Sequence, residues 1–417
     1  MSARKPKPKV ISLYSGAGGL DYGFEAAGFE TLFTNDVDHD SCETLRQNRK
    51  WTVVEGSIFD VSNEQILDEA GVEAGEADVL IGGPPCQPFS KSSYWVRGDA
   101  ARLNDPRAAT LDAYLRVLEG VQPRAFLLEN VYGIAYSDKN EGMQLLLNRI
   151  AQINRRTGTR YRPVFAVLNA AWFGVPQLRE RFFLIAARDG ADFEFPKAAY
   201  APPSRDQKAL GTLPTYRTAW DALADVRPSS DEDLEVRGKW AGLLPSIPEG
   251  QNYLHHTERG DGMPLFGWRR RYWNFLLKLA KRLPSWTIQA QPGPSVGPFH
   301  WENRRLSHRE LCRLQTFPDD VHVFGTRMSV QRQIGNAVPS LLAEVLAREI
   351  KTQLLGYRRT SEPLTLLPPD RSPAPPAERV RAVPSEYEEL AGRHEAHPGT
   401  GKGPRSVQQQ RGDELFV

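Results

Sequence analysis

Short apolar runs alternate with amphipathic or polar segments through the first 188 residues. Runs of strand length occupy residues 10–14, 30–34, 51–54, 78–81, 125–128, 161–168 and 181–187. The turn Ser15–Gly19 separates the first run from Leu20–Ala27, which has helical spacing and ends before Gly28. Because strands that alternate with helices are typical of parallel sheets, we predict an α/β fold with a doubly wound, mostly parallel sheet.

The pattern changes after residue 188. Residues 189–285 are irregular and rich in proline, glycine and tryptophan, which predicts a second, smaller domain. Amphipathic spacing returns at Ser307–Thr316 and Ser340–Gln353 and predicts two helices in a segment that spans residues 286–357. Residues 358–417 are rich in proline and polar side chains, so we expect a disordered tail.

The composition is that of an ordinary globular protein. Of the 417 residues, 25% are charged and 40% hydrophobic, and the net charge of +2 does not by itself indicate a nucleic-acid partner. No apolar run approaches the roughly 20 residues of a membrane span, and no apolar signal core follows Met1–Lys9, so we expect a cytoplasmic protein with no membrane partner. The three cysteines form neither a disulfide framework nor a zinc-site spacing, so no metal is expected.

The loop Gly82–Ser90 is the first candidate for chemistry. It reads Gly-Gly-Pro-Pro-Cys-Gln-Pro-Phe-Ser, and its prolines make a stiff connection that presents Cys86 just after a predicted strand. A lone free cysteine is most often an inert core residue. However, Glu129 also follows a predicted strand, and ligands of open α/β sheets bind beyond the carboxyl ends of strands. We therefore expect Cys86 and Glu129 to share one crevice.

The glycine turn indicates a cofactor with a ribose. Gly16, Gly18 and Gly19 do not have the dinucleotide spacing with a third glycine, so a pyrophosphate ligand is disfavoured. Asp36 lies about 20 residues further on, where a ribose-binding acid belongs in a nucleotide fold.

A basic and aromatic cluster lies in the second half of the chain. Residues 253–310 hold ten Lys or Arg against four Asp or Glu, and include Trp268-Arg-Arg-Arg-Tyr-Trp273. Basic surfaces interleaved with aromatics suit phosphates and bases, although any one of these residues, taken alone, is more often part of a small core or a solvated face.

Taken in order, these elements resemble the DNA (cytosine-5)-methyltransferase family over about residues 10–188 and 286–350. Six motifs carry the resemblance: Leu13–Gly19, Gly83–Ser90, Glu129–Val131, Gln177–Arg181, Arg305–Pro318 and Gln333–Pro339. The resemblance implies a Rossmann-like catalytic domain at 1–188 that binds S-adenosylmethionine, a target-recognition domain at 189–285 and a return to the catalytic domain at 286–357.

The resemblance also implies roles for single residues. Cys86 would be the nucleophile on C6 of the target cytosine, Glu129 would hold its N3 edge, and Arg181, with its neighbour Arg179, would bind O2. The implied cofactor residues are Tyr14, Gly16, Gly18, Gly19, Asp36, Val37, Ser57, Ile58, Gly83, Pro85 and Asn336. Asp36 and Ser57 depart from the usual Glu and Asp of the family. The implied DNA contacts are Ser90, Arg97, Arg269, Arg270 and Arg271.

The expected function is methylation of C5 of a cytosine in a short sequence of double-stranded DNA, by base flipping and a covalent Cys86 adduct. A monomer is expected, in a restriction–modification or phage-defence setting with a cognate nuclease or other defence proteins as partners. Three alternatives stay open: an RNA substrate, a catalytically silent DNA-binding relative, and, least favoured, a dehydrogenase. The intact set of Cys86, Glu129, Arg179 and Arg181 argues against a silent relative.

Overall fold

The computed structural model describes residues 6–85, 109–131, 141–203, 213–267 and 273–391. Its main feature is a seven-stranded sheet in the order β3-β2-β1-β4-β5-β8-β6. The strands of this sheet are β1 (Lys9–Leu13), β2 (Glu30–Asp36), β3 (Thr52–Glu55), β4 (Val79–Gly82), β5 (Ala125–Asn130), β6 (Val164–Asn169) and β8 (Glu180–Ala187). The first five strands are parallel, whereas β8 is antiparallel to both of its neighbours. The predicted α/β fold with a mostly parallel, doubly wound sheet is confirmed.

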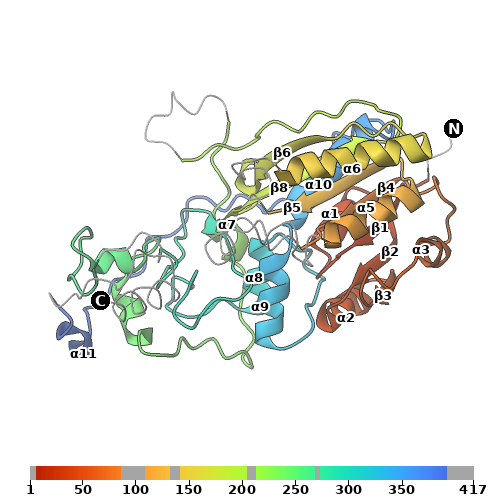
Figure 1. Cartoon of the computed structure of the whole chain (residues 1–417). Helices are drawn as coiled ribbons and strands as arrows, with labels where there is room; N and C mark the ends of the chain where they lie inside the picture. The colour runs from red at the N-terminus through yellow and green to blue at the C-terminus, as the bar shows by residue number, and fades with distance from the viewer. Residues whose placement is uncertain (1–5, 86–108, 132–140, 204–212, 268–272, 392–417) are drawn as a thin grey trace, which may run out of the picture.

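Helices cover both faces of the sheet (Figure 1). They are α1 (Gly19–Ala26), α2 (His39–Asn48), α3 (Asn63–Ala70), α5 (Ala109–Val121), α6 (Glu141–Thr157) and α10 (Ser340–Gln353). Side chains of β1 alternate between two cores: Ile11 and Leu13 pack with α3, α5 and α6, whereas Val10 packs with α1 and α10. Burial on both faces explains why the strands read as continuous apolar runs.

The remaining regular elements are short. They are β7 (Gln177–Leu178), which pairs in parallel with β9 (Ser285–Trp286), the helices α7 (Ala219–Leu223), α8 (His308–Leu314), α9 (Arg327–Asn336) and α11 (Ser385–Glu388), and the 3-10 helices η5 (Ala170–Phe173), η6 (Ala241–Ser246) and η7 (Tyr253–His256). Figure 1 shows α8 and α9 between the sheet and the irregular region around η6 and η7. None of the helices described here is long and apolar enough to cross a bilayer.

The irregular region has a small core of its own. It contains the buried side chains of Leu243, Leu244, Ile247, Leu276 and Phe299. This core stabilises a region that has few helices and strands. The predicted helices at Ser307–Thr316 and Ser340–Gln353 are present as α8 and α10, whereas α9 was not predicted.

The expectation of a disordered tail from residue 358 is wrong for residues 358–391. Leu364, Leu366 and Leu367 pack against the core beside α10, and Tyr387 of α11 is buried in the core of the irregular region. The Arg371 guanidinium lies 2.7 Å from the Asp225 carboxylate. Residues 358–391 are therefore held by scattered contacts with the sheet domain and with the irregular region. Amino-acid composition alone does not reveal such contacts. Residues 392–417 lie outside the described residues.

Candidate active site

A cavity of about 610 Å³ opens at the carboxyl ends of the parallel strands. It lies at the point where the strand order reverses, with β1, β2 and β3 on one side and β4 and β5 on the other. Residues that follow each of these five strands line it. Ligands of open α/β sheets bind at such a reversal, so this is the candidate active site.

Most of the predicted site residues line this cavity. They are Tyr14, Gly16, Gly19, Asp36, Val37, Ser57, Ile58, Gly83, Pro85, Glu129, Arg181 and Asn336. The predicted residues that do not line it are Gly18 and Arg179. Outside the described residues lie Cys86, Ser90, Arg97, Arg269, Arg270 and Arg271.

The Asp36 carboxylate is fixed by two backbone donors. The amide of Gly16 donates to Oδ2 at 2.8 Å, and the amide of Asp38 donates to Oδ1 at 2.9 Å. Burial raises the pKa of Asp36, and these two hydrogen bonds oppose that rise. Asp36 therefore ties the glycine turn after β1 to the end of β2 and presents a carboxylate to the cavity.

Gly18 serves the packing of the turn. Its φ of +85° is in the left-handed region, and a Cβ there would lie 2.8 Å from Cδ2 of Leu45. Glycine at this position lets α1 start close to α2. The structure therefore gives Gly18 a packing role, and its predicted cofactor contact stays a prediction.

Two exposed apolar side chains lie at the rim of the cavity. Val37 is 71% exposed and Phe59 is 55% exposed, and both line the cavity. Together they offer exposed apolar surface to the cavity, which suits a flat apolar ligand group. Sequence reasoning missed Phe59, which follows the predicted Ser57 and Ile58 directly.

The segment that follows α8 supplies one wall of the cavity. Gln333, Asn336 and Val338 line it, which brings residues from late in the chain to the glycine turn. Arg332 lines the same wall, and its Nη2 lies 2.6 Å from Oδ1 of Asp38. This ion pair links α9 to the loop after β2. Sequence reasoning missed Arg332, because nothing near it in sequence signals a partner almost 300 residues away.

Glu129 and Arg181 form an ion pair that faces the cavity. Arg181 Nε lies 2.9 Å from Oε1 of Glu129, and both side chains are largely buried. Burial raises the pKa of Glu129, and the positive charges of Arg181 and Arg179 oppose this rise. A Cβ on Gly83 would lie 2.7 Å from Oε2 of Glu129, so glycine is needed at that position for the carboxylate to reach the loop after β4.

Arg179 is a structural residue rather than a residue of the cavity. It is 1% exposed and donates hydrogen bonds to the carbonyls of Ile288, at 3.2 Å, and Gly335, at 2.6 Å. It therefore joins the strand of Arg181 to the segment after β9 and to α9. These two hydrogen bonds give Arg179 a positioning role in the described structure, and its predicted role in the reaction stays a prediction.

The entry to the loop of Cys86 is held at two consecutive carbonyls. Asn130 Nδ2 donates to the carbonyl of Pro84 at 3.1 Å, and Thr110 Oγ1 donates to the carbonyl of Pro85, also at 3.1 Å. The two donors come from the end of β5 and the start of α5. The chain is thus fixed immediately before Cys86, at the edge of the cavity that contains Glu129.

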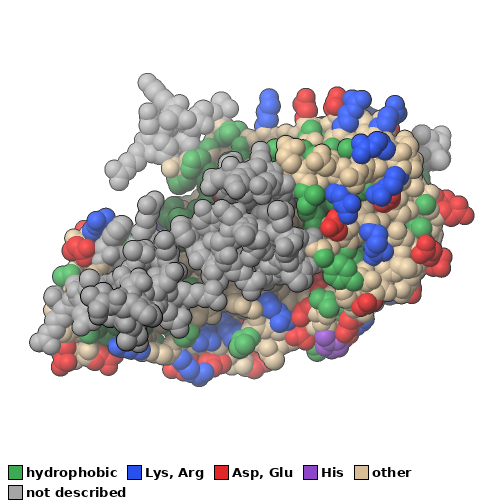
Figure 2. Space-filling view, in the orientation of Figure 1, with side chains coloured by type: hydrophobic (Ala, Val, Ile, Leu, Met, Phe, Trp, Pro, Cys, Tyr) green, Lys and Arg blue, Asp and Glu red, His purple; other side chains and the backbone are tan. Residues whose placement is uncertain are grey.

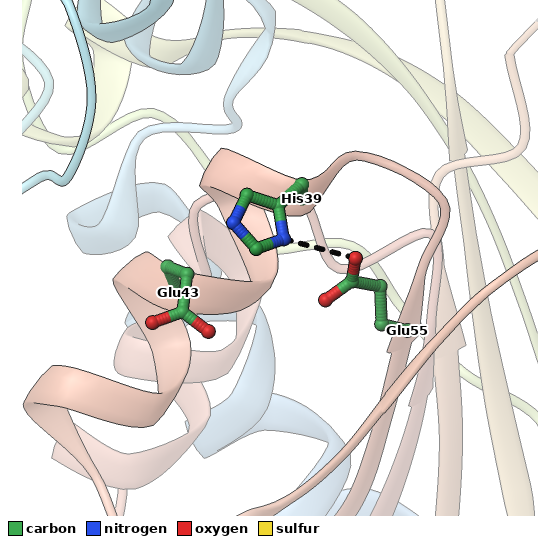
Figure 3. Close-up of side chains that lie close together, drawn as sticks. All are labelled: His39, Glu43 and Glu55. Atoms are coloured by element: carbon green, nitrogen blue, oxygen red, sulfur yellow. Dashed lines mark hydrogen bonds and ion pairs between the residues drawn. The ribbon is translucent and has the colours of Figure 1, made fainter.

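A separate group of metal-capable side chains lies on α2 and β3. Figure 3 shows His39, Glu43 and Glu55 close together, with Nδ1 of His39 3.0 Å from Oε1 of Glu55. Arg46 Nη1 lies 2.8 Å from both carboxylates. Because Arg46 already balances these acids, the group is an exposed ion-pair network.

The comparisons with known proteins agree with this geometry. The model of the family "C-5 cytosine-specific DNA methylase" matches residues 8–352. The chain is 40% identical over 372 residues to the Type II methyltransferase M.SacI of Streptomyces achromogenes, covering 84% of this chain and 93% of that protein. It is 33% identical over 358 residues to the Type II methyltransferase M.NgoFVII of Neisseria gonorrhoeae, covering 84% and 88%.

Solved structures show the same fold. The methyltransferase EhMeth of Entamoeba histolytica superposes with a TM-score of 0.55 at 16% identity, covering 84% of this chain and 99% of that one. At this identity the likeness establishes the fold alone. The family match, which extends over most of the chain and contains the motifs around the cavity, establishes more: the chain belongs to the C-5 cytosine-specific DNA methylase family.

Proposed function

We propose that this protein transfers a methyl group from S-adenosylmethionine to C5 of a cytosine in a short, specific sequence of double-stranded DNA, through a covalent adduct with Cys86. The observation that carries the proposal is the buried Glu129 and Arg181 pair facing a cavity at whose edge the chain is fixed just before Cys86. The Type II relatives support a role in a restriction–modification system, in which a cognate nuclease would recognise the same sequence.

The cavity has features that fit S-adenosylmethionine. Asp36 presents a carboxylate suited to ribose hydroxyls, and the exposed Val37 and Phe59 would contact the adenine ring. The turn of Gly16 and Gly19 brings backbone close to the ligand without the third glycine of a pyrophosphate site. When bound, S-adenosylmethionine supplies the methyl group as a carbon that a nucleophile can attack.

Glu129 and Arg181 would hold the target cytosine. The Glu129 carboxyl suits the N3 and exocyclic amine edge, and the Arg181 guanidinium suits O2. Since burial raises the pKa of Glu129, its protonated form is accessible at a higher pH than for an ordinary glutamate. A protonated Glu129 can donate to N3 as negative charge develops on the ring.

The covalent steps balance as follows. The Cys86 thiolate forms a bond to C6, and the electron pair of the C5–C6 double bond moves toward C5, with Glu129 stabilising the charge that reaches N3. C5 would then form its bond to the methyl carbon while the bond from that carbon to the sulfonium sulfur breaks, so that the electron pair stays on sulfur and S-adenosylhomocysteine is the leaving group. A base removes the C5 proton, the released pair restores the double bond, and Cys86 leaves as thiolate. Because C5 and C6 are stacked inside a duplex, the nucleotide must be flipped into the cavity first.

The direct test is a methylation map of DNA from cells that express the chain. Plasmid DNA from these cells is expected to carry 5-methylcytosine in one short recurring context, read by bisulfite or nanopore sequencing. The empty vector is the control for methylation by the host. Complete absence of the mark with a folded protein would overturn the proposed substrate, and a mark found on RNA in the same cells would move the activity to RNA.

Removal of the Asn130 anchor provides a second test. The Asn130→Ala change deletes the donor to the Pro84 carbonyl, so the loop of Cys86 loses one of its two fixed points. We expect kcat to fall by about 10²-fold, the cost of a displacement of roughly 1 Å in a catalytic group. The unpaired buried carbonyl would also lower the free energy of unfolding by about 1–3 kcal/mol.

Single-turnover methylation and chemical denaturation measure these two effects separately. The matched control is Asn154→Ala, which removes an amide that donates to the Tyr161 carbonyl at 2.9 Å and accepts from Thr159 and from the Tyr161 amide, and which does not line the cavity. This control is expected to lower stability and leave kcat unchanged. Equal kcat values for Asn130→Ala and wild type would show that the anchor does not position Cys86.

A further inference from the structure

A second cavity, of about 600 Å³, adjoins the first. One side is formed by residues 290–299, which are rich in proline and glycine, and the other by Arg305, Leu306 and the start of α9. Arg332 lines both cavities, so the two spaces meet at this side chain. None of the roles proposed above makes use of this second cavity.

The charge of the second cavity is positive. Its lining includes Arg305, Arg327 and Arg332, and the one carboxylate among its lining residues is Asp40. Figure 2 shows both blue and red side chains along the lower margin of this face, below the place of α8 and α9 in Figure 1. Arg332 is paired with Asp38, so the remaining positive charge comes from Arg305 and Arg327.

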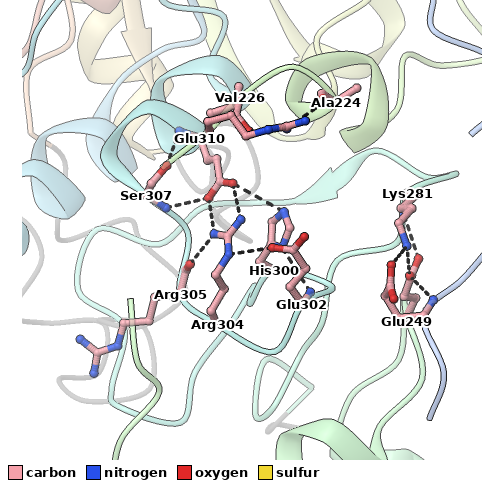
Figure 4. A network of polar contacts seen from close by, with 12 residues as sticks. Ala224, Val226, Glu249, Lys281, His300, Glu302, Arg304, Arg305, Ser307 and Glu310 are labelled. Carbon is pink, nitrogen blue, oxygen red and sulfur yellow. Dashed lines mark hydrogen bonds and ion pairs between the residues drawn. The ribbon is translucent and has the colours of Figure 1, made fainter. Parts of the chain in front are cut away.

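The Arg305 side chain forms no hydrogen bond or ion pair with the described residues, although its charge contributes to lowering the pKa of Asp233. Its neighbour Arg304 donates to both carboxylate oxygens of Glu310 at 2.8 Å, which is a satisfied bidentate pair. Figure 4 shows the guanidinium of Arg305 pointing away from this network. A charged side chain that lines a cavity without a hydrogen bond or ion pair is available to an incoming anion.

Arg327 is only partly satisfied. Its Nη2 donates to the carbonyl of Leu306 at 2.7 Å, but its Nη1 is buried without a hydrogen bond among the described residues and lies 3.7 Å from Oε2 of Glu232. Burial lowers the pKa of Arg327, and the positive charge of Arg305 lowers it further, so the two cations repel one another, while the carboxylates of Glu232, Asp233 and Glu310 act in the opposite direction. An anion between them would relieve this repulsion.

The remaining surface of the cavity suits a nucleotide strand. Pro292, Pro294, Pro298 and Val296 give an apolar surface of the kind that packs against deoxyribose. The first turn of α9 also opens here, and the unpaired amides at a helix N-terminus add partial positive charge that favours phosphate.

We propose that the second cavity binds the sugar–phosphate backbone of the substrate DNA beside the target cytosine, with Arg305 and Arg327 on one phosphate. Arg305 begins the motif Arg305–Pro318 but has no role among those assigned above, and the proposal does not involve residues 269–271. The inference rests on the proposed function, because it takes DNA as the substrate. In this proposal, the second cavity positions the DNA strand whose target base enters the first cavity.

The test measures DNA affinity as a function of salt for Arg305→Gln and Arg305→Lys. Loss of one phosphate contact should reduce the slope of log K against log salt by about 0.9, which corresponds to roughly eightfold weaker binding at 0.1 M salt and little difference near 1 M. Arg305→Lys should retain most of the slope. Since the Arg305 side chain forms no hydrogen bond or ion pair with the described residues, neither change should affect folding, and S-adenosylmethionine affinity should stay at the wild-type value.

The matched control is Arg149→Gln, which removes an exposed arginine that pairs with Asp112 and lines neither cavity. It should leave affinity, slope and methylation unchanged. An Arg305→Gln slope equal to that of wild type would overturn the inference while leaving the proposed function intact. A wild-type protein that methylates no DNA and shows no salt-dependent DNA binding would instead remove the proposed function on which the inference rests.

Discussion

The Cys86→Ser variant is expected to lose methyl transfer by roughly 10⁴- to 10⁶-fold, the scale seen when a covalent nucleophile is removed. The reason is chemical: a thiolate is accessible near neutral pH, whereas a serine hydroxyl without a base stays protonated and adds poorly to C6. Cys86 itself lies outside the described residues, but the carbonyls of the two residues before it are held by Asn130 and Thr110. The change should therefore leave the cofactor cavity and its affinity for S-adenosylmethionine unaltered.

The chain offers a matched control for this variant. Cys312 is buried in the core that contains α8 and α9, and burial raises the pKa of its thiol to about 12. A thiol in that state cannot act as a nucleophile, so Cys312→Ser should keep the wild-type rate. The readouts are methylation of duplex DNA and the mass of a protein–DNA adduct formed on DNA with 5-fluorocytosine, whose fluorine blocks the release step. A stable adduct with Cys86→Ser would contradict the assignment.

The fold could be predicted from sequence because burial on both faces of the sheet gives a strong local signal. Each run of strand length found in the first 188 residues overlaps a strand of the seven-stranded sheet. The signal disappears in residues 213–267, where a small core is built from 3-10 turns and loops whose contacts are distant in sequence. Helix α9 was missed for a related reason, since its polar residues face neighbours far away in the chain.

The candidate site was predictable where chemistry is concentrated in a short motif. Glu129 and Arg181 were named from their motifs, and the structure places them 2.9 Å apart at the cavity. Residues whose role depends on three-dimensional neighbours were not recognised. Asn130 was known as part of a motif, but its hydrogen bond to Pro84 spans 46 residues and leaves no local pattern. Arg179 was named with Arg181 because both belong to the motif Gln177–Arg181, and the sequence does not reveal that the buried Arg179 side chain donates to two distant carbonyls.

The tail illustrates the limit of composition as a guide. Residues 358–391 contain many prolines and few apolar residues, which is typical of disorder. However, Glu344 of α10 accepts hydrogen bonds from the amides of Thr365 and Leu366, and Lys281 in the irregular region pairs with Glu378 at 2.8 Å. A few such contacts, each involving a distant partner, attach a polar segment to both halves of the molecule.

The Glu129→Gln variant is expected to lower kcat by roughly 10²- to 10⁴-fold, the usual contribution of a positioned acid or base. Glutamine keeps the shape of the side chain but has no proton to transfer and no charge to balance Arg181. DNA affinity should stay near the wild-type value, because the change is confined to groups that act on the flipped base. Single-turnover rates and equilibrium DNA binding, measured on the same preparations, separate the two effects.

The pH dependence distinguishes proton donation by Glu129 from a purely structural role. Burial raises the pKa of Glu129, and the charges of Arg181 and Arg179 oppose the rise. As the pH falls, Glu129 therefore becomes protonated at a higher pH than an ordinary glutamate does. If protonated Glu129 acts on N3, the wild-type rate should increase along this limb, and the limb should be absent in Glu129→Gln. The matched control Glu349→Gln changes a partly buried carboxylate of α10 that pairs with Arg359, and it should keep both the rate and the limb. A Glu129→Gln profile with the wild-type limb would assign that titration to another group and leave Glu129 with the task of orienting Arg181.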